Sequence, residues 1–256
     1  MVSILLPLYI YPENDSWEPL LTMAAAHSGV EFTVVVNPDS GPGPDNLPDE
    51  NYVDALRSLG DYPNVNILGY IRCAYGDRLV DEIDADIAIY GAWESEFEGL
   101  EDSAAVSLQG IFVDEMPAEL EYVDLMSNIT ETIQNTWAST LNREATVIYN
   151  PGVVVDPSFY SYADSIVAFE DAETERSVFI SDALEDVEWD NRGKSGVIVH
   201  SFGGSWNELQ VLVGEVADSG LERLFVTDQT GGVYNEWPGM WQSLVEIVSE
   251  LEMQAR

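Results

Sequence analysis

Residues 110–115 read Gly-Ile-Phe-Val-Asp-Glu, an apolar run that ends in two adjacent carboxylates. A continuous apolar run, without the alternation of apolar and polar residues seen in half-buried strands, is typical of a strand buried on both faces, as in parallel sheets. Seven further short runs rich in β-branched and aromatic residues end in polar, Gly or Pro residues: Ile4–Tyr11, Phe32–Asn37, Val65–Ile71, Thr146–Asn150, Ile166–Glu170, Val197–Ser201 and Leu224–Asp228. Together they predict eight strands.

The segments between these runs have the apolar spacing of amphipathic helices. The clearest examples are Tyr122, Met126, Ile129, Ile133 and Trp137; Trp206, Leu209, Val213 and Val216; and Trp241, Leu244, Val248 and Leu251. Eight strands alternating with helices over about 250 residues predict one α/β domain, residues 1–256, folded as a (β/α)8 TIM-type barrel. An open doubly wound sheet shows the same alternation and is the competing architecture.

Two intervals depart from this regular alternation. The apolar run Ile87–Tyr90 is interpreted as part of a long third crossover and not as a ninth strand. The fifth crossover, residues 151–165, is too short for a full-length helix.

The composition indicates a folded, strongly acidic protein. The 256 residues are 46% hydrophobic, and 9 Lys and Arg against 47 Asp and Glu give a net charge of −38. Such a surface repels phosphate backbones and anionic headgroups, so neither nucleic acid nor a membrane surface is expected as a partner. Cys73 is the single cysteine, which excludes an intramolecular disulfide. The start of the chain, residues 1–12, lacks a basic region and is interpreted as the first strand, so a cytoplasmic monomer is expected unless a leader has already been removed.

The charge of −38 also predicts a dependence on salt. Self-repulsion destabilises a compact chain, and at molar salt the Debye length falls to about 3 Å. We expect the melting temperature to rise between about 0.1 M and molar KCl, as in a protein from a salt-loving source. A melting temperature that is flat or falling over that range, measured by calorimetry, would contradict this interpretation.

Acidic residues stand at the ends of two predicted strands, where a barrel places its active site. Asp114 and Glu115 end one strand and Glu170 ends another. Adjacent side chains on a strand point to opposite faces, so Asp114 and Glu115 can share the barrel mouth only if the strand ends or bulges between them. Two carboxyls from different strands are what glycoside hydrolysis needs. The sequence therefore predicts Asp114, Glu115 and Glu170 as catalytic residues.

Other polar and aromatic residues near strand ends or in the loops are candidates to bind a substrate. Aromatic rings offer stacking surfaces for sugars, although core packing is the commoner role of any one ring. The candidate substrate-binding residues are Tyr9, Tyr11, Asn37, Tyr70, Tyr75, Arg78, Trp93, Asn150, His200, Asp228 and Trp237. Metal-dependent hydrolysis through Asp114, His200 and Asp228 is a poorer hypothesis, because two histidines in the chain leave little choice of imidazole ligands. No metal or organic cofactor is expected.

Several fragments, in order along the chain, resemble the spherulation-specific, or spherulin-4-like, proteins. They are Leu-Tyr-Ile-Tyr-Pro (8–12), Asn-Pro-Asp-Ser-Gly-Pro-Gly (37–43), Gly-Tyr-Ile (69–71), Tyr-Gly-Asp-Arg (75–78), Gly-Ile-Phe-Val-Asp-Glu (110–115), Asn-Pro-Gly (150–152), Ala-Phe-Glu (168–170), Val-Thr-Asp (226–228) and Tyr-Asn-Glu-Trp-Pro-Gly-Met-Trp (234–241). The resemblance implies a (β/α)8 glycoside hydrolase that cleaves α-1,4-linked N-acetylgalactosamine within galactosaminogalactan. The family's essential acids correspond to Asp114, Glu115 and Glu170. Cys73 stands where the family pattern has threonine, so some substrate contacts are expected to differ.

The leading hypothesis is a glycoside hydrolase that acts on an amino-sugar-containing polysaccharide. Asp114 is expected to be the nucleophile or base, Glu170 the acid, and Glu115 a supporting acid that orients the substrate. The alternative from a different class is a barrel that binds carbohydrate without cleaving it. Retention or inversion stays open, because the distance between the two carboxyls decides it.

Overall fold

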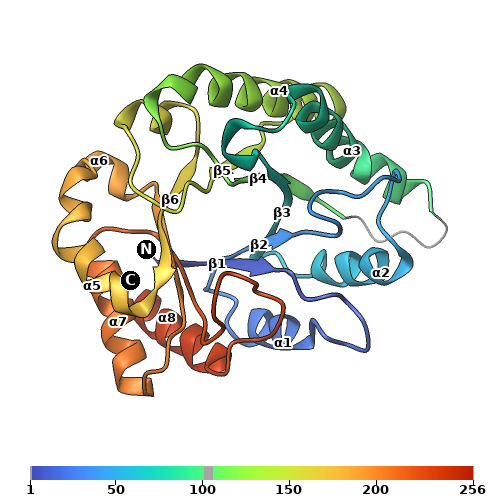
Figure 1. Ribbon diagram of the computed structural model, residues 1–256. Coiled ribbons are helices and arrows are strands. Elements are labelled where there is room, and N and C mark those ends of the chain that lie inside the picture. The colour runs from blue at the N-terminus through green and yellow to red at the C-terminus, as the bar shows by residue number, and fades with distance from the viewer. Residues whose placement is uncertain (1, 101–105, 256) are drawn as a thin grey trace.

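In the computed structural model, which describes residues 2–100 and 106–255, eight parallel strands close into a barrel that helices surround (Figure 1). Each strand pairs with the next in chain order, and β1 pairs with β8 to close the ring. The strands are β1 (Ser3–Leu8), β2 (Phe32–Val36), β3 (Val65–Arg72), β4 (Leu108–Asp114), β5 (Thr146–Tyr149), β6 (Ser165–Ala172), β7 (Ser195–His200) and β8 (Arg223–Val226). The (β/α)8 barrel expected from the sequence is confirmed, and the doubly wound sheet is excluded.

Helices follow the strands around the outside of the barrel (Figure 1). They are α1 (Glu18–Ala26), α2 (Glu50–Leu59), α3 (Val80–Glu98), α4 (Val123–Leu141), α5 (Glu173–Ser181), α6 (Trp189–Arg192), α7 (Trp206–Asp218) and α8 (Trp241–Ala255). Short 3₁₀ turns occupy Ala74–Gly76, Leu120–Tyr122, Pro157–Ser161 and Ala183–Asp186. Ile87–Tyr90 lies within α3, and the fifth crossover holds only a 3₁₀ turn, as the sequence predicted. None of the helices in the described part of the chain has the length and apolarity needed to cross a membrane.

The first predicted strand is too long at its carboxyl end. β1 stops at Leu8, so Tyr9 and Tyr11 belong to the loop that follows and not to the strand. The neighbouring eighth strand likewise ends earlier than predicted, at Val226, and leaves Asp228 in a loop. After β1 the apolar character continues through Tyr9, Ile10 and Tyr11, which is why that apolar run overestimates the strand.

Close approach of β4 to β5 requires glycine at position 110. A Cβ atom at Gly110 would lie 1.8 Å from the carbonyl oxygen of Thr146, so no other residue fits there. The register between β3 and β4 shifts just before this point, between Ile67 and Leu68. The side-chain oxygen of Gln109 accepts a hydrogen bond from the Ile67 N–H at 2.6 Å and satisfies the donor that the shift leaves without a strand partner.

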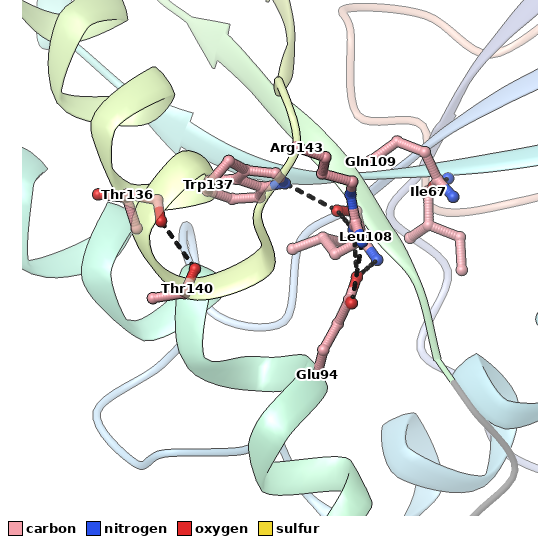
Figure 2. A network of polar contacts seen from close by, with 8 residues as sticks. All are labelled: Ile67, Glu94, Leu108, Gln109, Thr136, Trp137, Thr140 and Arg143. Carbon is pink, nitrogen blue, oxygen red and sulfur yellow. Dashed lines mark hydrogen bonds and ion pairs between the residues drawn. The ribbon is translucent and has the colours of Figure 1, made fainter.

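An ion pair holds the start of β4 against α3 and α4 (Figure 2). Arg143 donates to Glu94 and, at 2.9 Å, to the carbonyl oxygen of Leu108, while Glu94 accepts from the Leu108 N–H at 2.8 Å. The indole N–H of Trp137 donates to the same Leu108 carbonyl at 2.9 Å. The two charges thereby satisfy the first backbone groups of the strand that carries Asp114 at its other end.

Candidate active site

The end of β4 brings two adjacent carboxylates to the mouth of the barrel. The strand ends at Asp114, and Glu115 has a left-handed backbone with a φ of 49°. This end of the strand between Asp114 and Glu115 is what allows both side chains to face the mouth. The turn is held by backbone hydrogen bonds from Tyr75 N–H to the Glu115 carbonyl at 2.8 Å and from Cys73 N–H to the Asp114 carbonyl at 2.9 Å. A left-handed non-glycine residue is strained, and such strain is common at functional sites.

The turn after β5 positions the third acid. Asn150 is followed by Pro151 and by Gly152, whose φ of 68° only glycine adopts without strain. The Gly152 carbonyl accepts from the Glu170 N–H at 2.9 Å and fixes the backbone of Glu170 on β6. Glu170 therefore faces Asp114 across the same end of the barrel, with Asn150 on the strand between them.

A continuous line of hydrogen bonds crosses the barrel mouth. Tyr70 on β3 donates to Asp114 Oδ2 at 2.7 Å. Asn150 Nδ2 donates to Asp114 Oδ1 at 2.7 Å and to Glu170 Oε2 at 2.6 Å. Tyr234, from the loop between β8 and α8, donates to Glu170 Oε1 at 2.5 Å. Every oxygen of the two facing carboxylates thus accepts a hydrogen bond from a neutral donor.

These carboxylates line an open, mainly polar cavity of about 520 Å³. Its walls come from the ends of β4, β5, β6 and β7 and from the loop after β8. The ring of Tyr75, 65% exposed, stands at the edge of the cavity. The lining residues are Tyr75, Asp114, Glu115, Asn150, Pro151, Gly152, Val153, Glu170, His200, Gly231 and Gly232. A sugar unit placed here would meet three carboxylates and a histidine.

Burial sets the protonation of Asp114. Removal from water and, to a smaller extent, the negative charge of Glu170 raise the pKa of its carboxyl, against the lowering effect of hydrogen bonds from Tyr70, the Glu115 backbone and Asn150, and the net result is a pKa of about 6. Asp114 is therefore a carboxyl that exchanges its proton close to neutral pH, as a general acid must.

The tyrosines beneath the acids remain neutral donors. Burial and the neighbouring carboxylates raise the pKa of Tyr9, Tyr70 and Tyr234 well above the ordinary value. The Tyr9 ring packs against Tyr70 at 5.6 Å and Tyr234 at 6.0 Å between ring centroids. Because these rings pack against one another, Tyr9 and Tyr70 offer no free face on which a sugar could stack. They support the carboxylates instead.

The structure brings together about half of the residues that the sequence singled out. Asp114, Glu115, Glu170, Tyr75, Asn150 and His200 line the cavity, and Tyr9 and Tyr70 lie directly behind the acids. Their roles in binding or catalysis remain proposals.

Trp93 is a correction, because its side chain is fully buried in α3 and cannot reach a substrate. Its ring packs against Tyr90 at 4.7 Å and Phe97 at 6.4 Å between centroids. The helical spacing of these apolar residues is that of a core face, and core packing is the more common role of a tryptophan at such a position.

The other candidates have their polar atoms engaged outside the cavity. Asn37 Oδ1 accepts from the Gly41 N–H at 3.0 Å, Tyr11 bonds Asp49 and Asn51, and Arg78 pairs with Asp86 at 2.7 Å. Asp228 accepts from the Gly239 N–H at 2.9 Å, and Trp237 donates to the Ser16 carbonyl at 2.7 Å. None of these five residues lines the cavity, and their roles in binding a substrate stay predictions.

Tyr234 is the partner of Glu170 that reasoning from the sequence did not single out. It lies in the fragment Tyr-Asn-Glu-Trp of the family resemblance, but no periodicity marks it, because it sits in a loop with a left-handed φ of 47°. Only the fold brings this loop back over β6. The metal hypothesis finds no support in the described residues. Asp114 and His200 line the cavity, whereas Asp228 does not. No group of three or more potential ligands among these residues is placed to hold a metal ion.

A closed parallel barrel with facing carboxylates at the carboxyl ends of its strands has a glycoside-hydrolase-like, carbohydrate-binding architecture. Solved hydrolases share this fold at 10% identity: a chitinase from Rhizomucor miehei, with a TM-score of 0.53, and a xyloglucan-specific endo-β-1,4-glucanase from a metagenomic library, with a TM-score of 0.54. The alignments cover 96% of this chain and 99% of the chitinase, and 98% of this chain and 96% of the glucanase. At this identity the likeness shows the fold alone.

The chain belongs to spherulation-specific family 4, whose pattern matches residues 3–248. Spherulin-4 of Physarum polycephalum is 32% identical over 171 residues, which are 67% of this chain but only 45% of that protein. The crystal structure of Sph3 from Aspergillus clavatus in complex with GalNAc has 31% identity, a TM-score of 0.87 and coverage of 97% of both chains. The resemblance drawn from the sequence fragments is confirmed.

Proposed function

We propose that the protein is a glycoside hydrolase that cleaves an amino-sugar-containing polysaccharide with Asp114 and Glu170. The observation that carries the proposal is the pair of carboxylates bridged by Asn150 at the floor of an open cavity. Glycosidic cleavage needs one carboxyl to protonate the leaving oxygen and a second on the other side of the bond.

The bridge also limits how far apart the carboxyls lie. One nitrogen is 2.7 Å from Asp114 Oδ1 and 2.6 Å from Glu170 Oε2, so these two oxygens are separated by no more than about 5.3 Å. Retaining glycosidases hold their carboxyls about 5–5.5 Å apart, and inverting ones need about 6.5–9.5 Å to admit a water. The spacing favours retention through a covalent glycosyl–enzyme intermediate.

The environment favours Asp114 as the acid and Glu170 as the nucleophile, the reverse of the division expected from the sequence. Asp114 gives its proton to the glycosidic oxygen as the bond to the anomeric carbon breaks, and a Glu170 oxygen forms the new bond to that carbon. In the second step Asp114 takes a proton from water, whose oxygen displaces Glu170. The pKa of Asp114 near neutrality suits both steps, and Tyr234 holds the Glu170 side chain in place through a hydrogen bond to Oε1.

Glu115 is assigned to substrate orientation. It lies in the cavity lining and is within 3.9 Å of Arg72, a partly exposed pair at the edge of the site. A carboxylate there accepts hydrogen bonds from sugar hydroxyl or amide N–H groups without entering the reaction.

The sugar class is proposed from the relative. Sph3 binds GalNAc according to its structure, and its fold matches this chain over 97% of both lengths. The cavity is open and polar, which suits an internal unit of a chain better than an enclosed end group. N-acetylgalactosamine-containing polymers such as galactosaminogalactan, cleaved internally at α-1,4 linkages, are therefore the first substrates to examine.

The test is a reducing-end assay on a panel of polysaccharides at molar KCl. We expect the wild type to release reducing ends from an N-acetylgalactosamine-containing polymer and the double variant Asp114→Asn, Glu170→Gln to release none. Polymer binding by the wild type with no release of ends from any member of the panel would overturn the hydrolase and leave a carbohydrate-binding barrel.

A further inference from the structure

Asn150 is held in place by its backbone as well as by its side chain. Its backbone N–H donates to the Val113 carbonyl at 2.8 Å, and its carbonyl accepts from the Met116 N–H at 3.1 Å. Only 6% of the residue is exposed. A side chain anchored in this way at the end of β5 has little freedom to follow a substrate.

The amide presents all of its donor capacity to the two acids. Its two N–H groups have Asp114 and Glu170 as acceptors, whereas its Oδ1 is buried and has no hydrogen-bond partner among the described residues. An unpartnered buried acceptor destabilises the fold. The opposite orientation would place Oδ1 against two carboxylate oxygens, so the acids dictate how the amide lies.

We infer that Asn150 is a positioning residue that fixes the separation of Asp114 and Glu170 and sets the affinity of the pair for a shared proton. The inference rests on the proposed function and deepens it. It replaces the substrate-binding role expected for Asn150 from the sequence, because both of its N–H groups are already occupied.

The physical consequence concerns repulsion between the two acids. Two carboxylates this close destabilise each other when both are ionised, and a donor shared between them offsets the repulsion. Without the amide, the pair should bind its proton more tightly. The ionisable groups around Asp114 are Tyr70 from β3, Cys73 from the loop after it, Glu115 from the end of β4 with Arg72 beside it, Glu170 from β6, His200 from β7, and Tyr9, Tyr75 and Tyr234 from the loops. None of these bridges both acids.

The test titrates the carboxyls of the full protein by ¹³C NMR, with side-chain-labelled aspartate and glutamate and no substrate. In Asn150→Ala we expect Asp114 to titrate at least about one pH unit higher than in the wild type. Asn150→Asp keeps the shape of the side chain but removes its donors and should shift the titration in the same direction. Asn37→Ala is the matched control, because it removes a strand-end asparagine whose side chain contacts neither acid and accepts a hydrogen bond from the Gly41 N–H. It should leave the titration unchanged.

Kinetics supply the second readout. The pH optimum of Asn150→Ala should move upward by a similar amount, with the loss in kcat and not in KM. Titration of Asp114 at the wild-type pH in both Asn150 variants would overturn the inference. A wild type that cleaves nothing, together with a shifted titration in the variants, would instead overturn the proposed function and leave the positioning role standing.

Discussion

Replacement of Asp114 by asparagine is expected to lower turnover by at least about a thousand-fold and, at the same time, to raise the melting temperature at about pH 7.5. The loss of activity follows from the loss of the proton that the leaving group needs. The gain in stability follows from burial, which makes the ionised Asp114 unfavourable in the folded protein. Asparagine keeps the size of the side chain and is never charged.

The pH dependence of this gain has a definite sign. The folded protein holds the Asp114 proton with a pKa of about 6, above the ordinary value of 3.8, so the wild type loses stability as pH rises between these values. The melting-temperature difference between variant and wild type should be near zero below about pH 4 and reach its full value, equivalent to about 2–3 kcal/mol, above about pH 6.5.

Calorimetry across this pH range provides the measurement, with Asp39→Asn as the control. Asp39 is an exposed aspartate on the loop after β2, at the same end of the barrel, and its replacement should change neither activity nor the pH profile of stability. A difference in melting temperature between Asp114→Asn and the wild type that is independent of pH would contradict the burial argument.

Replacement of Glu170 by glycine should abolish hydrolysis and create a site that azide can rescue. Without its nucleophile the enzyme cannot form the glycosyl intermediate, while the vacated space admits a small anion. Azide then attacks the anomeric carbon from the side of Glu170 and yields a glycosyl azide of inverted configuration. An activated aryl glycoside is the appropriate substrate, because its leaving group needs little help from Asp114.

The matched variant Asp114→Gly distinguishes the two roles. There Glu170 still forms the intermediate, and azide displaces it from the other side to give the retained configuration. Proton NMR of the isolated azides reads the outcome directly. Inverted azide from Asp114→Gly and retained azide from Glu170→Gly would show that the acid and nucleophile assignments must be exchanged.

The fold was largely readable from the sequence, because each strand of a parallel barrel is buried on both faces and appears as an apolar run with a polar end. The same rule placed Asp114, Asn150 and Glu170 on one rim, since the carboxyl ends of parallel strands meet there. The sequence also required the strand to end or bulge between Asp114 and Glu115 if both were to face the mouth, and the strand does end at Asp114, with a left-handed φ of 49° at Glu115.

The contacts between these residues were not readable, because they depend on loops and on tertiary distance. Tyr234 reaches Glu170 from a loop 64 residues further along the chain. The double hydrogen bond of Asn150 depends on how close β4 and β6 come on either side of β5. Trp93 was misassigned because an aromatic residue looks the same in a sequence whether it faces a cavity or the core.

Double displacement, the mechanism we propose for Asp114 and Glu170, determines which anomer is released first. Time-resolved proton NMR of polymer digestion tests it most directly, at molar KCl and within the first minutes, before the new reducing ends mutarotate. With an α-linked N-acetylgalactosamine polymer, we expect the first anomeric signals of new ends to be those of the α anomer, and none to appear with Glu170→Gln. New ends that emerge first as the β anomer, or ends that Glu170→Gln still releases at the wild-type rate, would contradict it.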